Sequence, residues 1–301
     1  MLLSIITPCL NQVLFVKEAV ESVLAQDYYP VEHIVVDGGS TDGTLDVLAE
    51  FEGIRVISEP DRGLYDALNK GIAAARGDVI GFLNADDMYV PWVFQDVMRC
   101  FQRSPQLNSV CGGAEIVEHS PEGEKRKRVF LSPSYSSLSV RNICLGQPLL
   151  NARFFRKGVF HRLGYFDWRY RVGSDREFLV RLALAGVTSE HLPKCVYIYR
   201  SHPASLTFDP STRHAFETNQ EYWLIAERFL KQSLSQRERL WIQMWHARIS
   251  TEMVSLGLKK RNLDHTLRAL RRGFKSSPWW FAFLGIRFAR RLKMALRDAS
   301  I

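Results

Sequence analysis

Hydrophobic residues in the first hundred positions follow two alternating patterns. Short continuous apolar runs, typical of buried strands, are separated by stretches in which apolar residues recur at helical spacing. The runs predict strands at residues 3–7, 33–36, 55–57 and 79–83, and the stretches predict helices at residues 13–25, 43–51 and 64–75. Strands that alternate with helices in this way predict an α/β fold, with a mainly parallel sheet covered by helices on both faces.

The pattern changes after about residue 108. The chain then predicts strands at 109–116, 128–131 and 195–199, a polar loop at 119–127, and helices at 156–163 and 175–185. Beyond His214 nearly every segment has helical spacing, and Asp209-Pro210 is a suitable boundary. We therefore expect a first domain at 1–209, with halves at about 1–107 and 108–209, and a helical, basic extension at 210–301.

Composition and cysteine usage fit a folded protein of a reducing compartment. The 301 residues are 46% hydrophobic and 24% charged, as in globular proteins. The five cysteines are scattered and no pair has CxxC spacing, which argues against a disulfide framework or a zinc site and favours the cytoplasm. The apolar start of the chain is short and lacks a basic leader, so we interpret it as a buried strand. No window reaches the roughly 18 uninterrupted apolar residues of a membrane span.

The positive charge is concentrated at the C-terminus. The formal net charge is +8, and residues 256–301 contain twelve Lys or Arg against two Asp, so this tail carries +10 and the rest of the chain −2. An apolar block at 279–286, which begins with Trp279 and Trp280, precedes Arg287. Aromatic residues beside cations favour a helix at an anionic membrane surface. The alternative is a helical hairpin that packs its aromatics on the first domain and leaves its basic face in solvent.

Paired acids follow the fourth predicted strand, in the sequence Asn84-Ala85-Asp86-Asp87. The carboxyl ends of parallel strands form the edge at which open α/β sheets bind ligands. Carboxylate oxygens at this edge suit Mg²⁺ or Mn²⁺ carrying a diphosphate. The stretch therefore indicates an enzyme that handles a nucleotide-activated substrate, with a capped surface turn as the alternative.

Taken together, several segments resemble the family 2 glycosyltransferases of the GT-A fold. The resemblance covers roughly residues 3–205, and its order and spacing make it specific. It rests on the segments SIITPCLN, VVDGGSTDGT, SEPDRGLYDALNKGIAAARGD, FLNADD, QPLLNARFFRKGVFHRLGYFD, GSDREFLVRL and YRSHPASLT. It implies a Rossmann-like, mainly parallel sheet flanked by helices, a donor half and an acceptor half, and a role in making bacterial surface polysaccharides.

The resemblance also implies which residues hold the donor. In the family, the acid after the second strand hydrogen-bonds the nucleotide base, and the early Thr-Pro turn packs beside it. The residues assigned to the nucleotide sugar on this basis are Pro8, Asp37, Arg62, Asp66, Lys70, Asn84 and Asp86. For Asp37 the alternative is a residue that only caps a turn, and for Lys70 it is a position on a solvated helix face.

Metal binding and catalysis are implied in the same way. The metal ligands would be Asp86, Asp87 and His202, although the commonest form of the acidic motif begins with Asp where Asn84 stands. A structural role is the alternative for His202. The acid of the GSDREF segment, Asp175, would be the general base that deprotonates the acceptor hydroxyl. A plain helix cap is the alternative for Asp175, and Glu177 is the fallback base.

The leading hypothesis is therefore an inverting glycosyltransferase that moves a single sugar from a UDP- or GDP-sugar to a hydroxyl of a glycan or lipid-linked acceptor. It would use Mg²⁺ or Mn²⁺ and work in the cytoplasm, with the tail docking at the inner face of the plasma membrane as a further hypothesis. The residues QRERLW at 236–241 are one position out of register with the QxxRW motif of processive polymerases. We therefore interpret this likeness as a coincidence and expect the addition of a single sugar.

Other classes fit less well. A nucleotidyltransferase would need a Gly-rich, basic loop where residues 8–12 read PCLNQ, and a dehydrogenase would need GxGxxG there. A nucleic-acid-binding protein acting through the tail is disfavoured because a carboxylate-lined cleft would repel phosphates unless a metal were present, so no nucleic acid is expected as a partner. An inactive scaffold is disfavoured because Asp37, Asp86, Asp87 and Asp175 are all present.

Overall fold

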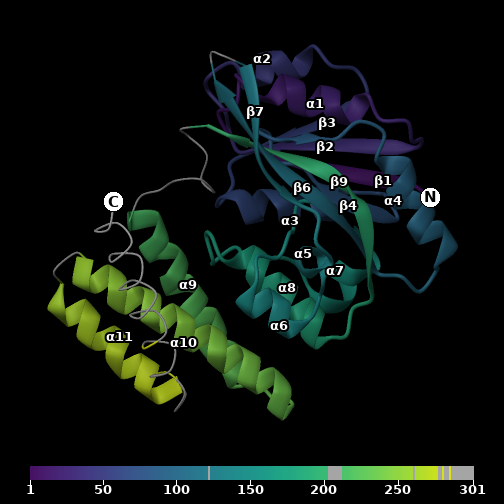
Figure 1. Cartoon of the computed structure of the whole chain (residues 1–301). Coiled ribbons are helices and arrows are strands. Elements are labelled where there is room, and N and C mark those ends of the chain that lie inside the picture. Colours follow the sequence, from purple (N-terminus) through teal and green to yellow (C-terminus); the bar gives the residue numbers. More distant parts are fainter. Residues whose placement is uncertain (121–122, 203–211, 260–261, 277–279, 281–284, 286–301) are drawn as a thin grey trace, which may run out of the picture. The chain divides into compact units, whose positions relative to one another are not determined.

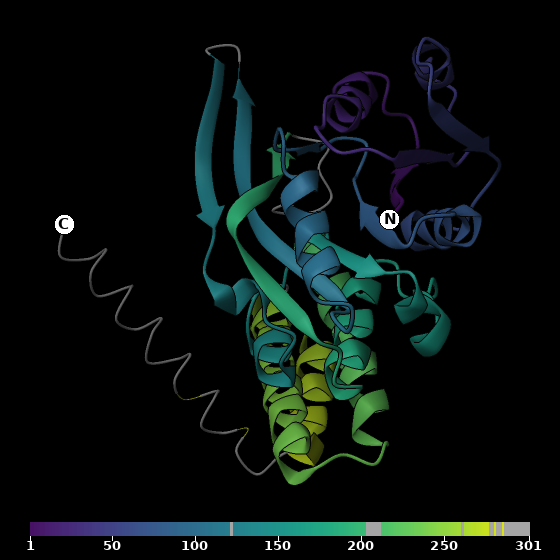
Figure 2. The same ribbon diagram turned by 90° about the vertical axis from the view of Figure 1, so that its right-hand side faces the viewer.

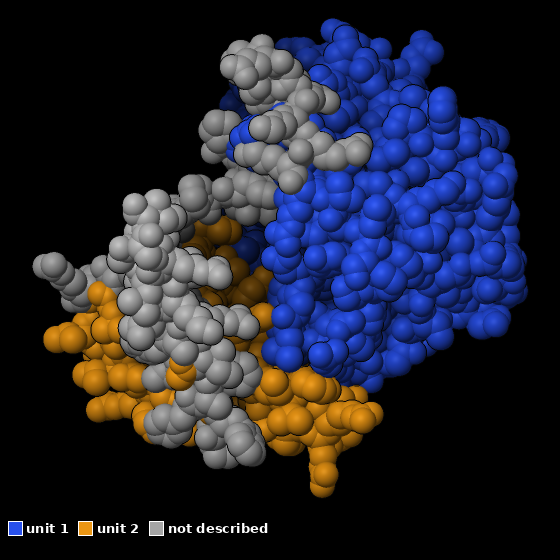
Figure 3. All heavy atoms as spheres, viewed as in Figure 1, with its two compact units in different colours: residues 1–209 blue, residues 210–301 orange. Residues whose placement is uncertain are grey.

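A computed structural model of the chain describes residues 1–120, 123–202, 212–259, 262–276, 280 and 285 (Figure 1). The chain divides into two compact units, Met1–Asp209 and Pro210–Ile301, which are coloured separately in Figure 3. Most of the basic tail predicted from the sequence, including Trp279 and Arg287, lies outside the described residues.

The first unit is built on one sheet, in which the described residues form nine strands. The strands are β1 (Leu3–Cys9), β2 (Val31–Asp37), β3 (Ile54–Ser58), β4 (Val79–Phe82), β5 (Met88–Tyr89), β6 (Ser109–Ser120), β7 (Gly123–Phe130), β8 (Arg153–Arg156) and β9 (Ser189–Ser201). Their order is β3-β2-β1-β4-β8-β6-β9-β5, with β7 paired to β6. The first four strands are parallel, whereas β8 is antiparallel to both its neighbours. The expected parallel sheet is thus found in the first half, and the second half is mixed.

Helices cover both faces of the parallel half, as the sequence predicted. Leu3 and Ile5 of β1 belong to the same buried cluster as residues of α1 (Val16–Leu24) and α4 (Phe94–Arg103). Ile6 faces the other way, toward α3 (Leu64–Ala74), and α3 packs so closely that a Cβ on Gly71 would lie 2.3 Å from Ile6 Cγ2. Burial on both faces explains why β1 is a continuous apolar run rather than an alternating one. A short helix, α2 (Thr44–Ala49), packs beside α1.

An aromatic cluster joins the two halves of the first unit. Phe82 of β4 and Phe155 of β8 contact Phe160 of α7 (Gly158–Leu163), and Phe160 stacks on Phe178 of α8 (Ser174–Leu184) with ring centroids 5.3 Å apart. Rings of this size bury large apolar areas and fix the elements that carry them. The cluster therefore sets the position of α8, whose first turn contains Asp175.

Three features of the second half differ from the expectation. Most of the predicted loop at 119–127 belongs to the β6–β7 hairpin, which Figure 2 shows as two long strands side by side. Arg156 ends a strand instead of starting a helix, and α7 begins at Gly158. β5 and α4 had not been predicted. The remaining short helices of this unit are α5 (Pro133–Ser136) and α6 (Val140–Leu145).

The second unit is helical over its described residues, which confirms the expectation for them. It contains α9 (Thr212–Leu230), α10 (Gln236–Lys259) and α11 (Leu263–Ser276). Trp223 of α9 is buried and donates from its indole nitrogen to Ser250 Oγ of α10 at 2.8 Å. Trp280 is also buried, against Gly273 of α11. Among the described residues, no helix has both the length and the apolarity needed to cross a bilayer.

Candidate functional site

The carboxyl ends of β1, β2, β3 and β4 lie along one edge of the sheet, and the loops that follow them are tied together. Asn11 N donates to Ser40 Oγ at 2.7 Å, and Ser58 Oγ donates to Asp37 Oδ2 at 2.8 Å. Burial, followed by the charges of Asp37, Asp42 and Asp86, raises the pKa of the Cys9 thiol to about 12. The segments that follow β2 and β4 thus bring acids near the end of β1, where Pro8 is buried in the strand.

Asp37 is fully buried at the end of β2 and organises the turn that follows. Its two oxygens accept hydrogen bonds from Gly39 N, Ser40 N, Ser40 Oγ and Ser58 Oγ. Burial alone would raise the pKa of Asp37, but these donors outweigh burial and lower the pKa below its ordinary value. The turn role proposed as the alternative is therefore present in the structure, and a contact between Asp37 and a nucleotide base stays a prediction.

The paired acids after β4 face different surroundings. Asp87 is 4% exposed, and it accepts hydrogen bonds from Tyr197 OH at 2.7 Å, Arg200 N at 2.9 Å and Asn84 Nδ2 at 3.0 Å. Burial, together with the neighbouring charge of Asp86, raises the pKa of Asp87 well above its usual range. The Asp86 side chain is 23% exposed, and its Oδ2 lies 3.2 Å from His202 Nε2. Asp86 and His202 are thus the pair that the site presents, and Asp87 lies behind them.

His202 is held in place by aromatic and charged neighbours. Its ring stacks on Phe15 with centroids 4.4 Å apart. The guanidinium of Arg200 lies 5.2 Å from the centroid of the same Phe15 ring and pairs with Glu18 of α1. Stacking of this kind restricts the rotation of the imidazole and keeps it beside Asp86. Among the described residues, no group of three or more His, Cys, Asp or Glu side chains is arranged to hold a metal ion.

The segment before α3 is a network of paired side chains. Arg62 donates to Asp66 through its backbone and its guanidinium, which also lies 3.9 Å from the centroid of the Trp168 ring. Burial would raise the pKa of Asp66, but the hydrogen bonds and charge of Arg62 and the charge of Lys70 lower it. Lys70 Nζ contacts Pro60 O at 2.7 Å and Glu59 Oε1 at 2.9 Å. Donor binding by Arg62, Asp66 and Lys70 stays a prediction, and each already has a protein partner.

Asp175 lies in the first turn of α8 and accepts from Arg176 N at 2.5 Å. Burial raises the pKa of Tyr199 well above its ordinary value, and the charges of Asp87 and Asp175 are the next largest causes. The charges of both acids therefore act on the same buried phenol. The half-buried carboxylate of Asp175 is open enough to meet a substrate. Its role as base stays a prediction.

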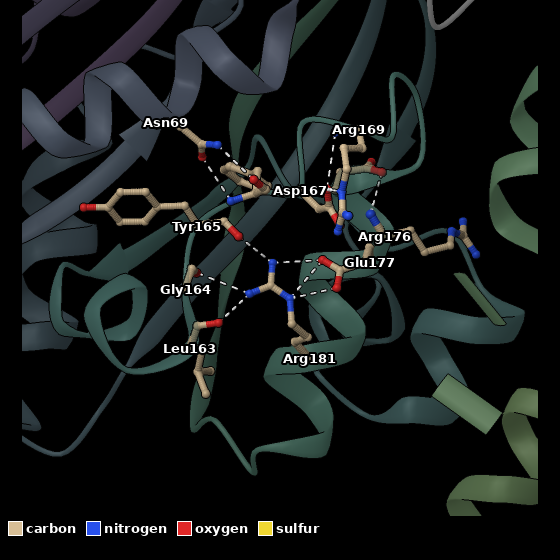
Figure 4. A network of polar contacts seen from close by, with 11 residues as sticks. Asn69, Leu163, Gly164, Tyr165, Asp167, Arg169, Arg176, Glu177 and Arg181 are labelled. Carbon is tan, nitrogen blue, oxygen red and sulfur yellow. Dashed lines mark hydrogen bonds and ion pairs between the residues drawn. The ribbon is translucent and has the colours of Figure 1, made fainter. Parts of the chain in front are cut away.

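Glu177, the fallback base, is part of a buried ion pair (Figure 4). Its side chain is 0% exposed, and both its oxygens accept from Arg181 Nε at 2.9 Å. Figure 4 shows the guanidinium of Arg181 also reaching the carbonyls of Leu163, Gly164 and Tyr165. Glu177 thus holds the end of α7 against α8, and this geometry argues against a catalytic role for it.

The loop between α7 and α8 is tied to α3, in the first half of this unit. Asn69 Nδ2 donates to Phe166 O at 2.8 Å, and Phe166 N donates to Asn69 Oδ1 at 3.0 Å. Tyr65 OH donates to Val172 O at 3.1 Å. This loop leads directly to Asp175, so α3 helps to position the start of α8.

The sequence analysis missed the residues that support the paired acids. Tyr197 and Arg200 fix Asp87, and Phe15 supports His202, but none of them had been assigned a role. For Tyr197 and Arg200 a signal existed, because they lie next to the YRSH segment that contains His202. Phe15 lies in an ordinary amphipathic stretch and carries no such signal.

Comparisons with known proteins agree with this geometry. The model of the glycosyl transferase family 2 matches residues 4–163. The chain belongs to glycosyltransferase family 2. A PGL/p-HBAD biosynthesis glycosyltransferase from Mycobacterium bovis is 32% identical over 193 residues, which cover 59% of this chain and 68% of that protein. The family accordingly makes this protein a glycosyltransferase that takes its sugar from a nucleotide sugar.

Solved structures share the fold. S. aureus TarS 1-349 in complex with UDP-GlcNAc has a TM-score of 0.70 at 17% identity, covering 94% of this chain and 84% of that one. The mannosyltransferase PcManGT from Pyrobaculum calidifontis, in complex with GDP-Man and Mn²⁺, has a TM-score of 0.59 at 17% identity, covering 96% of this chain and 80% of that one. These likenesses establish the GT-A fold, which confirms the fold expected from the sequence.

Proposed function

We propose that this family 2 glycosyltransferase transfers a single sugar, with inversion, from a UDP- or GDP-sugar to a hydroxyl of a glycan or lipid-linked acceptor in polysaccharide biosynthesis. The observation that supports the proposal is the pairing of Asp86 with His202 after β4, while the charge of Asp175, like that of Asp87, acts on the buried Tyr199. Asp86 and Asp175 have different surroundings, which suits two separate tasks: one acid would help to hold the donor and the other would remove a proton.

The donor site would use a divalent cation, Mg²⁺ or Mn²⁺, held by Asp86 and His202. A carboxylate oxygen and an imidazole nitrogen, 3.2 Å apart, suit Mn²⁺, and Mg²⁺ commonly takes one or two protein ligands while phosphates and water supply the rest. The oxygens of Asp87 already serve Tyr197, Arg200 and Asn84, so Asp87 would orient the pair rather than bind the cation. When bound, the cation would offset the negative charge that develops on the departing diphosphate.

Asp175 would take the proton from the acceptor hydroxyl while that oxygen attacks the anomeric carbon of the sugar. The bond from the oxygen to the sugar forms as the bond to the nucleoside diphosphate breaks, and attack from the opposite face inverts the anomeric centre. The half-buried position of Asp175 supports this role, since partial desolvation strengthens a carboxylate base. Glu177 cannot replace it while it is locked to Arg181.

Donor binding tests the proposal. Thermal shift with UDP-, GDP-, dTDP- and CDP-sugars, with and without Mn²⁺, is expected to show stabilisation by one nucleotide class that requires the metal. Asp86→Ala should abolish that stabilisation, whereas Asp46→Ala, which removes an exposed acid from α2, should leave it intact. A folded wild-type protein that no nucleotide sugar stabilises would contradict the proposal and favour the scaffold alternative.

We further propose that the second unit lies against an anionic membrane surface, where a lipid-linked acceptor would be found. On α11, Leu263, Leu267 and Phe274 are 74%, 53% and 56% exposed. Their spacing of four and seven residues places them on one face of the helix, and Arg268 and Arg271 on the same helix are also exposed. An exposed apolar stripe beside arginines suits the interface of an anionic bilayer.

Vesicle co-sedimentation tests membrane docking. Full-length protein is expected to bind phosphatidylglycerol vesicles and not phosphatidylcholine vesicles. Leu263→Ser/Leu267→Ser/Phe274→Ser should lose that binding. The matched variant Leu224→Ser/Leu240→Ser, which changes exposed leucines of α9 and α10, should keep it. Equal binding by both variants would contradict docking through α11.

A further inference from the structure

The carboxylate of Asp61 lies against the backbone of Gly38, at the end of β2. A Cβ on Gly38 would lie 2.6 Å from Asp61 Oδ2 and 3.1 Å from Asp61 Cγ. Gly38 does not have a positive φ, so its backbone conformation does not require glycine. Glycine is required here for space, because the side chain of Asp61 takes up the volume that a residue at position 38 would fill.

Asp61 has a fixed orientation and one open oxygen. Its Oδ1 accepts a hydrogen bond from Gly63 N at 2.7 Å, whereas its Oδ2 accepts none from the residues that the structure describes. The side chain is half-buried, so a ligand can reach it. Asp37 differs in this respect, because four donors already occupy the roughly four lone-pair positions of its carboxylate.

The position of Asp61 is suited to a nucleotide. Glu59 N donates to Asp37 O at 3.0 Å, so the chain after β3 continues along the carboxyl edge of β2. Open α/β sheets bind nucleotides in the crevice outside the carboxyl ends of their strands. Gly38 adds a surface without a side chain next to the open oxygen, which leaves room for a flat ring.

We propose that Asp61, and not Asp37, accepts the ring N–H of the donor's nucleobase and thereby selects uracil. This inference rests on the proposed function of the site. The N3–H of uracil donates one hydrogen bond, which matches the one open oxygen. Cytosine and adenine have an acceptor nitrogen at the equivalent position and are repelled by a carboxylate. Guanine has two adjacent donors that call for both oxygens, one of which Gly63 already engages.

Calorimetric titration in the presence of Mn²⁺ tests this assignment, with UDP, CDP, GDP and pyrophosphate as probes. Wild-type protein is expected to bind UDP at least about tenfold more tightly than CDP or GDP, as one hydrogen bond to a charged group allows. Asp61→Asn, which replaces an acceptor oxygen with a donor, should reduce the ratio of UDP to CDP affinity by at least about tenfold. Its affinity for pyrophosphate, which lacks a base, should not change. Asp46→Asn on α2 removes the same charge from an exposed position and should leave every value unchanged.

The outcomes separate this inference from the proposed function. If Asp61→Asn keeps the wild-type ratio while Asp86→Ala abolishes binding, the Asp61 assignment is wrong and the transferase proposal stands. Tighter binding of CDP or GDP than of UDP by the wild type would overturn the base assignment in the same way. If the wild type binds no nucleotide at all, both proposals fail.

A swap of the two positions gives a second, independent test. Gly38→Asp alone should disrupt the site, because its side chain would meet Asp61. Gly38→Asp/Asp61→Gly moves the carboxylate to the other side of the same space, so it should bind UDP more tightly than Asp61→Gly does. Equal affinity of these last two variants would count against a role for the carboxylate.

Discussion

The ion pair between Glu177 and Arg181 offers a quantitative test of how α7 and α8 are held together. Replacing Arg181 by Met keeps most of the side-chain volume but removes the guanidinium that pairs with the Glu177 carboxylate, which is 0% exposed (Figure 4). The substitution also removes the donor to the carbonyls of Leu163, Gly164 and Tyr165. Breaking a buried pair by removing one partner typically costs about 3–5 kcal/mol, and we expect a loss in that range.

The assay is urea unfolding followed by hydrogen exchange in peptides of the first unit, because the two units need not unfold together. Arg103→Met serves as the control in the same unit. The Arg103 side chain is 68% exposed and pairs with Glu190, so its loss should cost at most about 1 kcal/mol. The difference between the two losses in unfolding free energy shows how much of the effect comes from burial of the ion pair.

A double substitution makes the reasoning refutable. Glu177→Leu/Arg181→Met removes both charges of the pair, and replacing a buried ion pair by apolar residues is often neutral or stabilising. The double variant should therefore be more stable than Arg181→Met alone. If Arg181→Met loses less than about 1 kcal/mol, or if the double variant is the less stable of the two, the stabilising role assigned to this pair is wrong.

Three further predictions follow from the same structure. Asp175→Asn should lower kcat about 10²–10⁴-fold in a transfer assay without changing the melting temperature, and an unchanged kcat would remove Asp175 as the base. Gly71→Ala should cost about 1–3 kcal/mol by urea unfolding, because its Cβ would meet Ile6, whereas Gly158→Ala, with open space around it, should be neutral or slightly stabilising. Burial lowers the pKa of His33 to about 3, so between about pH 6.5 and pH 3 the unfolded chain binds a proton at His33 that the folded chain does not bind. The contribution of His33 to the free energy of unfolding should therefore be fully present above about pH 6.5 and be lost as the pH drops toward 3. If the unfolding free energy of His33→Gln has the same dependence on pH as that of the wild type, this assignment is wrong.

The sequence predicted the parallel half of the sheet well because β1, β2 and β4 are largely buried on both faces. A strand of this kind is a continuous apolar run, and the helices between the strands keep their own period. The second half was less predictable. β8 is only four residues long and pairs with β4 and β6, which lie far from it in the chain. The β6–β7 hairpin passes through polar residues that read as a loop, since strand pairing there does not depend on an apolar pattern.

The candidate site shows the same division. Motif order and spacing were enough to predict the family, which the comparisons confirmed. They did not distinguish Asp86 from Asp87, because two adjacent acids are chemically equivalent in a sequence. The difference comes from Tyr197 and Arg200, which lie 110 and 113 residues further along the chain and enclose Asp87. Glu177 likewise looked available for catalysis until the structure paired it with Arg181.

What the sequence determined by itself was the class of fold, the family and the edge of the sheet at which chemistry-bearing residues gather. These features depend on the local spacing of apolar residues and on the residues at strand ends, and both can be read directly from the sequence. Only the tertiary structure decided which carboxylates are open and which are already satisfied. That property depends on donors brought from distant segments, as Ser58 is brought to Asp37 and Asp61 to Gly38, and no local pattern contains it.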